Sequence, residues 1–182
     1  MARTTTSRHR TKLSLASAAG ALALGFAGWT GSTWYAAAHD DSVRFATTRD
    51  EVLAAGEQAA LNMNTLDHRD LERGLDAWEQ SATGSLLDEL REGRPEFEKQ
   101  VRAARTVTTA QVLSGAVTEL DEREGRAGVL IAMRITVDPP KKKPSTKESR
   151  LLGELTRTGD GWKLSGLGQA PAGETPTDTP SD

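Results

Sequence analysis

The stretch GVLIAMRITV, residues 128–137, decides the fold. Large apolar residues alternate along it with smaller or more polar ones, which is the period of a β-strand with one buried face. The chain supplies partner strands on both sides, with Thr106–Leu120 before this stretch and Leu151–Thr158 and Trp162–Leu167 after it. The predicted inward face, which is also the candidate apolar cavity, consists of Val129, Ile131, Met133, Ile135 and Val137.

The links between these strands are short. Residues 158–161 read Thr-Gly-Asp-Gly, a composition typical of a tight hairpin because Gly and Asp tolerate positive φ. Neither face of Thr106–Leu120 is uniformly apolar, which a β-bulge would explain. Four consecutive strands with short links predict an antiparallel meander.

Helical patterns occupy residues 41–105. Asp67 is expected to cap a second helix by accepting the amide of Asp70, and Ser85 is a plausible cap for the next one. Pro95 fits the first position of a last helix, since its missing N–H would be unpaired there. Apolar stripes at helical spacing predict the buried faces; they comprise Phe45, Val52, Ala55, Ala59 and Met63, then Leu71, Leu75 and Trp78, then Leu86, Leu87 and Leu90, then Phe97, Val101 and Ala104.

Helices first and strands afterwards predict the α+β class, with the helices packed on a curved antiparallel meander sheet in a cone-like fold. The cone interior either holds a small apolar ligand or is filled by side chains, and we favour a plain core. Residues 39–168 form this domain, and the Pro-, Thr- and acid-rich residues 169–182 are expected to be disordered.

An uncharged apolar segment over residues 13–38 precedes the domain. A helix over Leu13–Thr33 would be about 31 Å long, which matches a hydrocarbon core of about 30 Å. Basic residues 1–12 predict a cytoplasmic N-terminus and an extracytoplasmic C-terminal domain, anchored in the plasma membrane by a single-pass transmembrane helix. The anchor residues are Leu13, Leu22, Leu24, Phe26, Trp29, Trp34 and Tyr35.

A cleaved signal peptide is the alternative, because Ala36-Ala37-Ala38 offers a small-residue cleavage site. We favour the uncleaved anchor, since the apolar stretch exceeds a signal h-region and bulky aromatic residues crowd the site. Small residues at a spacing of four also allow helix–helix association in the membrane.

Composition excludes several classes of function. The 182 residues carry 23 Lys and Arg against 26 Asp and Glu, a net charge of −3 that argues against nucleic-acid binding. Cys is absent, which excludes disulfides, thiol nucleophiles and Cys-ligated clusters, and three His residues are too few for a His-rich metal site. No cofactor is predicted.

The order of segments resembles a known family. A basic tail and an aromatic-ended span lead into AALNMNTLDHRDLERGLDAWEQSATGSLLDEL at 59–90, VRAARTVTTAQVL at 101–113 and GDGWKLSGL at 159–167. This resembles the actinobacterial Mce-associated membrane proteins, where Mce stands for mammalian cell entry. The matching structural motif comprises Asn62, Asp67, Arg69, Asp70, Thr83, Gly84 and Trp162; His68 stands where the family favours an aromatic residue.

The resemblance implies a nuclear-transport-factor-2-like, cystatin-like exported domain. It also implies a non-catalytic accessory role in the assembly or stabilisation of an Mce-type lipid or sterol transport system, with Mce transporter subunits and membrane lipid as partners. A membrane-anchored lipid-binding module is the alternative, and an enzyme of the cone fold is the third reading.

Three local features have a functional and a structural interpretation. His68 between Asp67 and Asp70 could form an acid/base dyad, but helix capping explains the carboxylates better. The collar His39-Asp40-Asp41 offers too few ligands for a metal site. The loop containing Lys141, Lys142 and Lys143 is a candidate contact for anionic lipid or an acidic partner, although a solvated hairpin loop is the favoured interpretation.

Overall fold

A computed structural model describes residues 41–171. The chain forms two compact units whose boundary in the sequence lies between Thr47 and Thr48, and the account below concerns the unit that begins at Thr48. The elements, in chain order, are α2 (Asp41–Met63), β1 (Leu66–Asp67), α3 (Leu71–Ser81), α4 (Gly84–Ala104), β2 (Val107–Asp121), β3 (Arg126–Asp138), β4 (Ser145–Thr158) and β5 (Gly161–Gln169).

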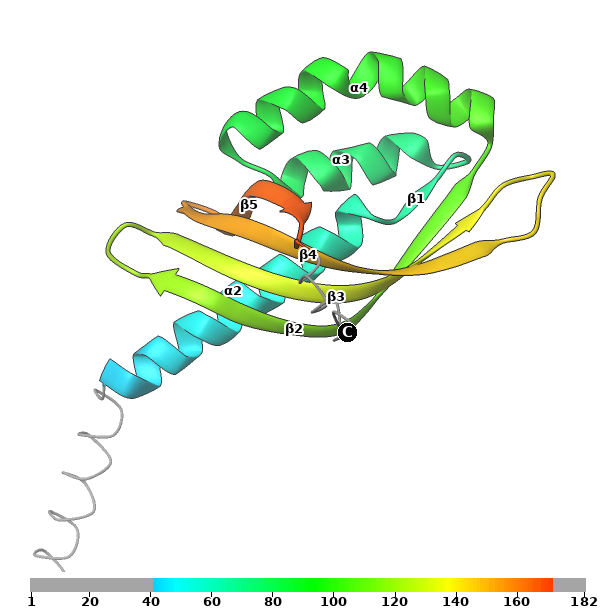
Figure 1. Cartoon of the computed structure of the whole chain (residues 1–182). Coiled ribbons are helices and arrows are strands. Elements are labelled where there is room, and N and C mark those ends of the chain that lie inside the picture. Colours follow the sequence, from blue (N-terminus) through cyan, green and yellow to red (C-terminus); the bar gives the residue numbers. More distant parts are fainter. Residues whose placement is uncertain (1–40, 172–182) are drawn as a thin grey trace, which may run out of the picture. The chain divides into compact units, whose positions relative to one another are not determined.

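The strands form one antiparallel sheet in the order β1-β2-β3-β4-β5, so the predicted meander is confirmed and gains the short strand β1 at its edge. Two register shifts interrupt β2, between Val112 and Ser114 and between Val117 and Glu119, which confirms the bulged character of this strand. The β4–β5 hairpin turns through Gly159 and Asp160, and Gly161 adopts a φ of 104°. Figure 1 shows the sheet curving, with α4 arched above α3.

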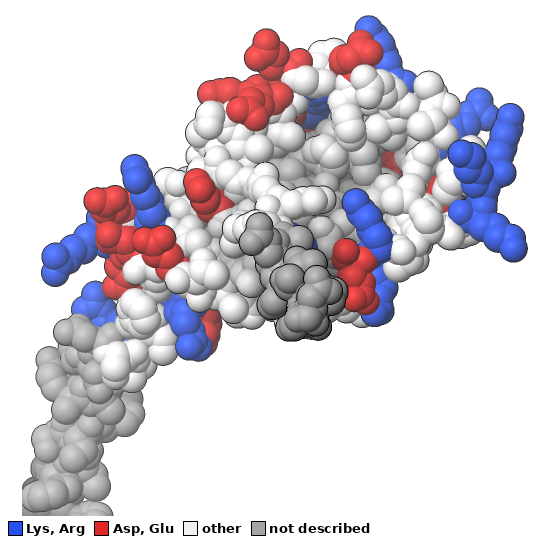
Figure 2. All heavy atoms as spheres, viewed as in Figure 1, with Lys and Arg blue, Asp and Glu red and all other residues white. Residues whose placement is uncertain are grey.

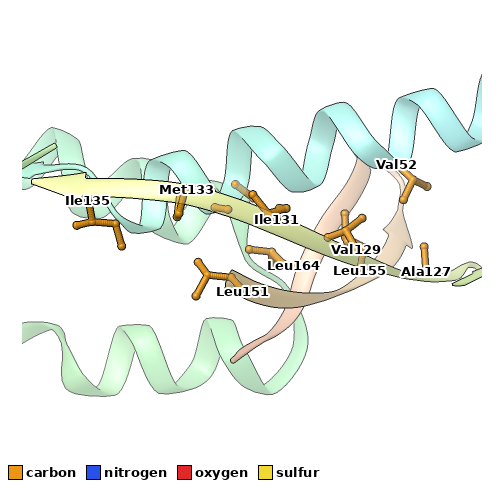
Figure 3. Packing of buried hydrophobic residues seen from close by; sticks show 11 residues of the cluster. Val52, Ala127, Val129, Ile131, Met133, Ile135, Leu151, Leu155 and Leu164 are labelled. Atoms are coloured by element: carbon orange, nitrogen blue, oxygen red, sulfur yellow. The ribbon is translucent and has the colours of Figure 1, made fainter. Parts of the chain in front are cut away.

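The main core lies between α2 and one face of the sheet. Val129, Ile131 and Met133 on β3 are fully buried, and Figure 3 shows them among Val52 of α2 and Leu164 of β5. A separate cluster of Leu66, Leu71 and Leu75 gathers under α3 and is completed by Trp78, Phe97 and Val101. The α+β expectation, with helices packed on an antiparallel sheet, is therefore confirmed.

The helix α2 approaches the sheet closely at Gly56. A Cβ atom placed on this buried glycine would lie 2.9 Å from a methyl group of Val129. Gly115 of β2 continues the close approach, since a Cβ there would lie 2.9 Å from Leu53. Closer than about 3.0 Å the neighbours must move, and in a close-packed core a β-branched Val has little freedom to do so.

Several sequence expectations were wrong in detail. Pro95 does not begin a helix but lies inside α4, which continues through it. The proline removes the hydrogen bond to the Arg91 carbonyl, yet it lies on the solvent side, and Leu90 and Phe97 on either side of it both face the neighbouring helix α3. Phe45 is 48% exposed and is not part of the core.

The helix starts also differ from prediction. Asp67 lies in β1, and α3 begins at Leu71 after Asp70, whose side chain makes no capping hydrogen bond. Thr83, rather than Ser85, precedes α4. At the other end β5 continues to Gln169, and the Ala170 amide donates to the Arg150 carbonyl at 2.9 Å, so the predicted tail begins too early.

The predicted anchor over 13–38, residues His39 and Asp40 of the collar, and the tail beyond 171 lie outside the described residues. Among the helices of residues 41–171, none is both long and apolar enough to span a bilayer.

Two glycine substitutions should have opposite effects on stability. Gly56→Ala forces a Cβ atom into Val129 and should lower the free energy of unfolding by about 1 to 3 kcal/mol, the usual cost of overpacking a core. Gly93→Ala, in the exposed middle of α4, meets nothing within 4 Å and should raise it by up to about 1 kcal/mol through helix propensity. Urea unfolding of the chain measures both changes; a stabilised Gly56→Ala variant would contradict the packing described here.

Candidate functional site

Asn62 connects α2 to α3. Its side-chain amide donates to Ser81 Oγ at 2.8 Å, its side-chain oxygen accepts from Gln58 at 2.8 Å, and its backbone carbonyl accepts from Trp78 Nε1 at 2.7 Å. The Trp78 ring packs in turn on Phe97 of α4, with ring centroids 5.2 Å apart. Asn62 therefore fixes the aromatic pair on which α3 and α4 meet.

The Asp67–Arg69 pair organises the turn between β1 and α3. The Arg69 guanidinium donates to both carboxylate oxygens of Asp67, at 2.9 Å and 2.7 Å, and the Arg69 amide donates to Asp67 Oδ1 at 2.9 Å. These hydrogen bonds lower the pKa of Asp67 from 3.8 to about 2. The carboxylate is thus held ionised by a structural partner.

His68 does not form the acid/base dyad that its position between Asp67 and Asp70 suggested. Its Nδ1 lies 3.6 Å from Asp67 Oδ1, beyond hydrogen-bond distance, and Nδ1 is buried without a hydrogen-bond partner. Asp70 pairs with Arg73 one turn along α3. The carboxylates on both sides of His68 therefore bind arginines rather than orient the imidazole.

The remaining motif residues join α4 to the sheet. The Thr83 amide donates to the Leu164 carbonyl of β5 at 2.7 Å, and Gly84 takes a φ of 58°, which favours glycine. Trp162 packs against the main core, and the Arg157 guanidinium lies 6.0 Å from its ring centroid. The hydrogen bond from Thr83 to Leu164 thus ties the start of α4 to the sheet.

Arg94 is the electrostatic centre of the helical layer. Its side chain, 24% exposed, pairs with Glu79 at 2.6 Å and Asp76 at 2.8 Å on α3, and with Glu98 at 3.1 Å on α4. The hydrogen bonds raise the pKa of Arg94 and lower the pKa of Glu79, to which Arg91 also donates. One guanidinium thus binds three carboxylates and ties the two helices together.

A groove opens beside this network. It has a volume of about 390 Å³ between α3 and α4, and its apolar floor consists of Leu75, Trp78, Leu90 and Phe97. A second hollow of about 310 Å³ lies between α4 and the start of β2, and Trp78 and Phe97 line this one as well. Sequence reasoning missed the groove because it ended a helix before Pro95, whereas the uninterrupted α4 forms the whole outer wall.

The other candidate positions lie apart from the groove. The β3 face, from Val129 to Val137, packs against α2 and β5; its first four inward residues are at most 6% exposed, so the candidate cavity is a closed core. Lys141–Lys143 are exposed in the β3–β4 loop, and Figure 2 shows basic side chains gathered at one end of the molecule.

A third hollow of about 560 Å³ is polar. Among residues 41–171, Arg126 is the one basic residue in its walls. Four carboxylates line it, those of Glu119, Asp121, Glu124 and Glu154. The Asp121 carboxylate accepts hydrogen bonds from the backbone amides of Glu124 and Arg123, and these bonds lower its pKa. Within residues 41–171 no group of three or more His, Asp or Glu residues is arranged to hold a metal ion.

Comparison with known proteins identifies one family and one fold. The family described as "Uncharacterized protein Rv1363c/MT1408-like" matches residues 13–171, from the predicted anchor to the end of the sheet. No curated protein matches the chain.

Solved structures share the fold at low sequence identity. An IcmL-like type IV secretion system protein from Legionella pneumophila superposes with a TM-score of 0.56 at 10% identity, covering 70% of this chain and 95% of that one. The periplasmic domain of DotI gives 0.55 at 17% identity, covering 66% and 94%. Agrobacterium tumefaciens VirB8 gives 0.54 at 8% identity, covering 71% and 96%. The nuclear-transport-factor-2-like cone expected from the sequence is confirmed.

Removing the Arg94 side chain should destabilise the domain. Arg94→Gln leaves Asp76, Glu79 and Glu98 close together without their shared cation, and we expect a loss of about 1 to 2 kcal/mol of unfolding free energy. Arg91→Gln is the matched control, because Arg91 is 60% exposed and pairs with Glu79 alone, and it should cost less than half as much. Urea denaturation of both variants makes the comparison; equal losses would show that the network adds nothing to a single pair.

The Asp67 carboxyl should titrate near pH 2. Because its pKa is lowered on folding, its contribution to stability is present above the ordinary value of 3.8 and is lost as the pH falls toward 2. The 13C shift of the carboxyl carbon, followed by NMR as a function of pH, measures the midpoint directly. In Arg69→Gln the midpoint should move back toward 3.8; an unchanged midpoint would show that Arg69 is not the cause.

Proposed function

Because this chain belongs to the Rv1363c/MT1408-like family, in agreement with the Mce-associated resemblance of its sequence, we propose that it is a non-catalytic accessory subunit of an Mce-type lipid or sterol transport system. In this proposal residues 13–38 anchor the protein in the plasma membrane as a single-pass helix. The cone domain then lies outside the cytoplasm and takes part in assembling or stabilising the transporter.

The family match that runs from the predicted anchor through the cone domain carries the proposal. The uncharged length of residues 13–38 and the basic residues before them favour an anchor with the cone domain on the outer side. The solved structures of the same fold include a domain described as periplasmic and a protein described as a type IV secretion system protein. These descriptions support a domain that lies outside the cytoplasm and works within a multi-protein assembly.

The internal structure favours binding over chemistry. The interior of the cone around β3 is closed by α2, so it offers no chamber in which a substrate would meet a catalytic group. The titratable groups near His68 are engaged by Arg69 and Arg73. The alternative of a lipid-binding module would require a different hollow from the one that the sequence indicated.

In this proposal the loop that carries Lys141–Lys143 gives the domain a contact point in addition to the membrane anchor. It projects from the β3–β4 hairpin, where prolines at 139, 140 and 144 prevent further strand pairing. Each lysine near an anionic surface contributes about 1 kcal/mol, so three lysines would orient the domain toward anionic headgroups or an acidic neighbour.

The full chain should co-purify with Mce subunits. We would tag the C-terminus in the native host, extract membranes with a mild detergent that keeps the transporter intact, and identify the retained proteins by mass spectrometry. Mce subunits should be enriched at least tenfold over an equally expressed tagged chain in which residues 39–182 are replaced by an unrelated exported domain. Recovery of the chain alone from extracts that still contain intact transporter would reject the proposal.

A further inference from the structure

The groove between α3 and α4 combines an apolar floor with an acidic outer wall. Glu89 and Glu96 line the groove itself, and Asp88 and Glu92 continue the same side of α4 at helical spacing. Figure 2 shows acidic side chains gathered over α4. A partly buried apolar floor beside acidic side chains is a feature of protein-binding grooves.

The acids of this wall are largely uncompensated. In the part of the chain that the structure describes, Asp88, Glu89 and Glu92 take part in no ion pair, while Glu96 pairs only with the exposed Lys99 at 3.4 Å. Arg94, the one cation lining the groove, is already bound by Asp76, Glu79 and Glu98. The groove therefore presents net negative charge to an incoming partner.

Gly93 leaves the wall of the groove open. It stands in the middle of α4 between Leu90 and Phe97, and a Cβ atom added there would meet no atom within 4 Å. A glycine at an exposed helix position costs up to about 1 kcal/mol relative to alanine. The missing side chain leaves room beside Trp78 and Phe97 for an apolar side chain from outside.

Neither the lysine loop nor residues 1–12 nor residues 172–182 have both properties that the groove requires of its occupant, which are basic charge and large apolar residues. Lys141–Lys143 carry positive charge but stand among prolines, with no large apolar residue from 138 to 147. Residues 1–12 are basic, yet their one large apolar residue is Met1, and residues 172–182 contain acids and no basic residue. The negative charge of the groove therefore favours a basic segment of a different protein over these three segments of this chain as the occupant.

We propose that this groove binds an amphipathic α-helix of a partner protein, with large apolar residues on one face and Lys or Arg along its flank. The inference rests on the proposed function, since it identifies the surface through which the accessory domain would contact its assembly. Two helices with an apolar floor between them accept a third helix, whose residues at i, i+3, i+4 and i+7 serve as anchors. The small volume of about 390 Å³ fits a few anchoring side chains.

Photocrosslinking from Gln100, an exposed residue that lines the groove, tests the inference. The full chain, expressed in its native host with p-benzoylphenylalanine at position 100, is irradiated in intact cells, and the adduct is identified by mass spectrometry. We expect a crosslink to a protein segment with apolar residues at helical spacing and basic residues beside them. Adducts to a second copy, to lipid, or to an acidic segment would overturn the proposal, as would the absence of any adduct.

Charge reversal supplies the second measurement. Glu89→Lys should lower the yield of the crosslink by about fivefold, the effect of about 1 kcal/mol. Glu51→Lys, the matched control, changes an exposed glutamate on α2 outside the groove and should leave the yield unchanged. Equal yields from native chain, Glu89→Lys and Glu51→Lys would overturn the electrostatic part of the argument.

Blocking the groove separates this inference from the proposed function. Gly93→Trp places a ring in the open wall and should reduce recovery of the partner at least tenfold, while Gly159→Trp, at an open turn of the β4–β5 hairpin, should not. If Mce subunits co-purify equally with Gly93→Trp, the groove inference fails and the proposed function stands. If the probe at position 100 crosslinks to a basic helix outside any Mce system, the groove inference stands and the proposed function fails.

Discussion

The close approach of α2 to the sheet is the constraint on which the rest of the domain depends. Gly56 of the helix faces the Val129 side chain, and Gly115 of the sheet faces the side chains of Glu57 and Leu53, so one partner in each close contact is a glycine without a Cβ atom. This contact buries the β3 row and leaves the centre of the domain filled with side chains. If α2 lay farther from the sheet, a cavity would open behind β3, and such a cavity could hold a ligand.

The same constraint moves the accessible apolar surface to the other helices. Since α2 closes the sheet, Trp78 and Phe97 complete a smaller cluster of their own, supported from Asn62 and from the Arg94 network. That cluster is half covered, and the hollows on its two sides are what the domain offers to an apolar partner. The closed core beneath α2 and the open hollows beside α4 are thus two results of one packing arrangement.

The sheet could be predicted from sequence because alternation along β3 is a local signal, and the bulges of β2 appeared as an imperfect alternation. The helical layer was harder, since Pro95 reads as a helix start while contacts distant in sequence hold α4 together through it. Asp67 likewise reads as a cap, but its arginine neighbour two residues on takes the carboxylate instead. To predict the groove one would have to know that Arg94 pairs with α3, and hydrophobic periodicity does not reveal that pairing.

The interrupted register of β2 has a consequence for association between copies. Only Val107 and Thr108 pair with β1, and in the described residues the remainder of that edge has no strand beside it. A long regular edge is a template for strand addition and aggregation, whereas bulges twist an edge out of the plane that a second strand requires. The irregularities at Val112–Ser114 and Val117–Glu119 therefore disfavour the joining of sheets from neighbouring copies along this edge.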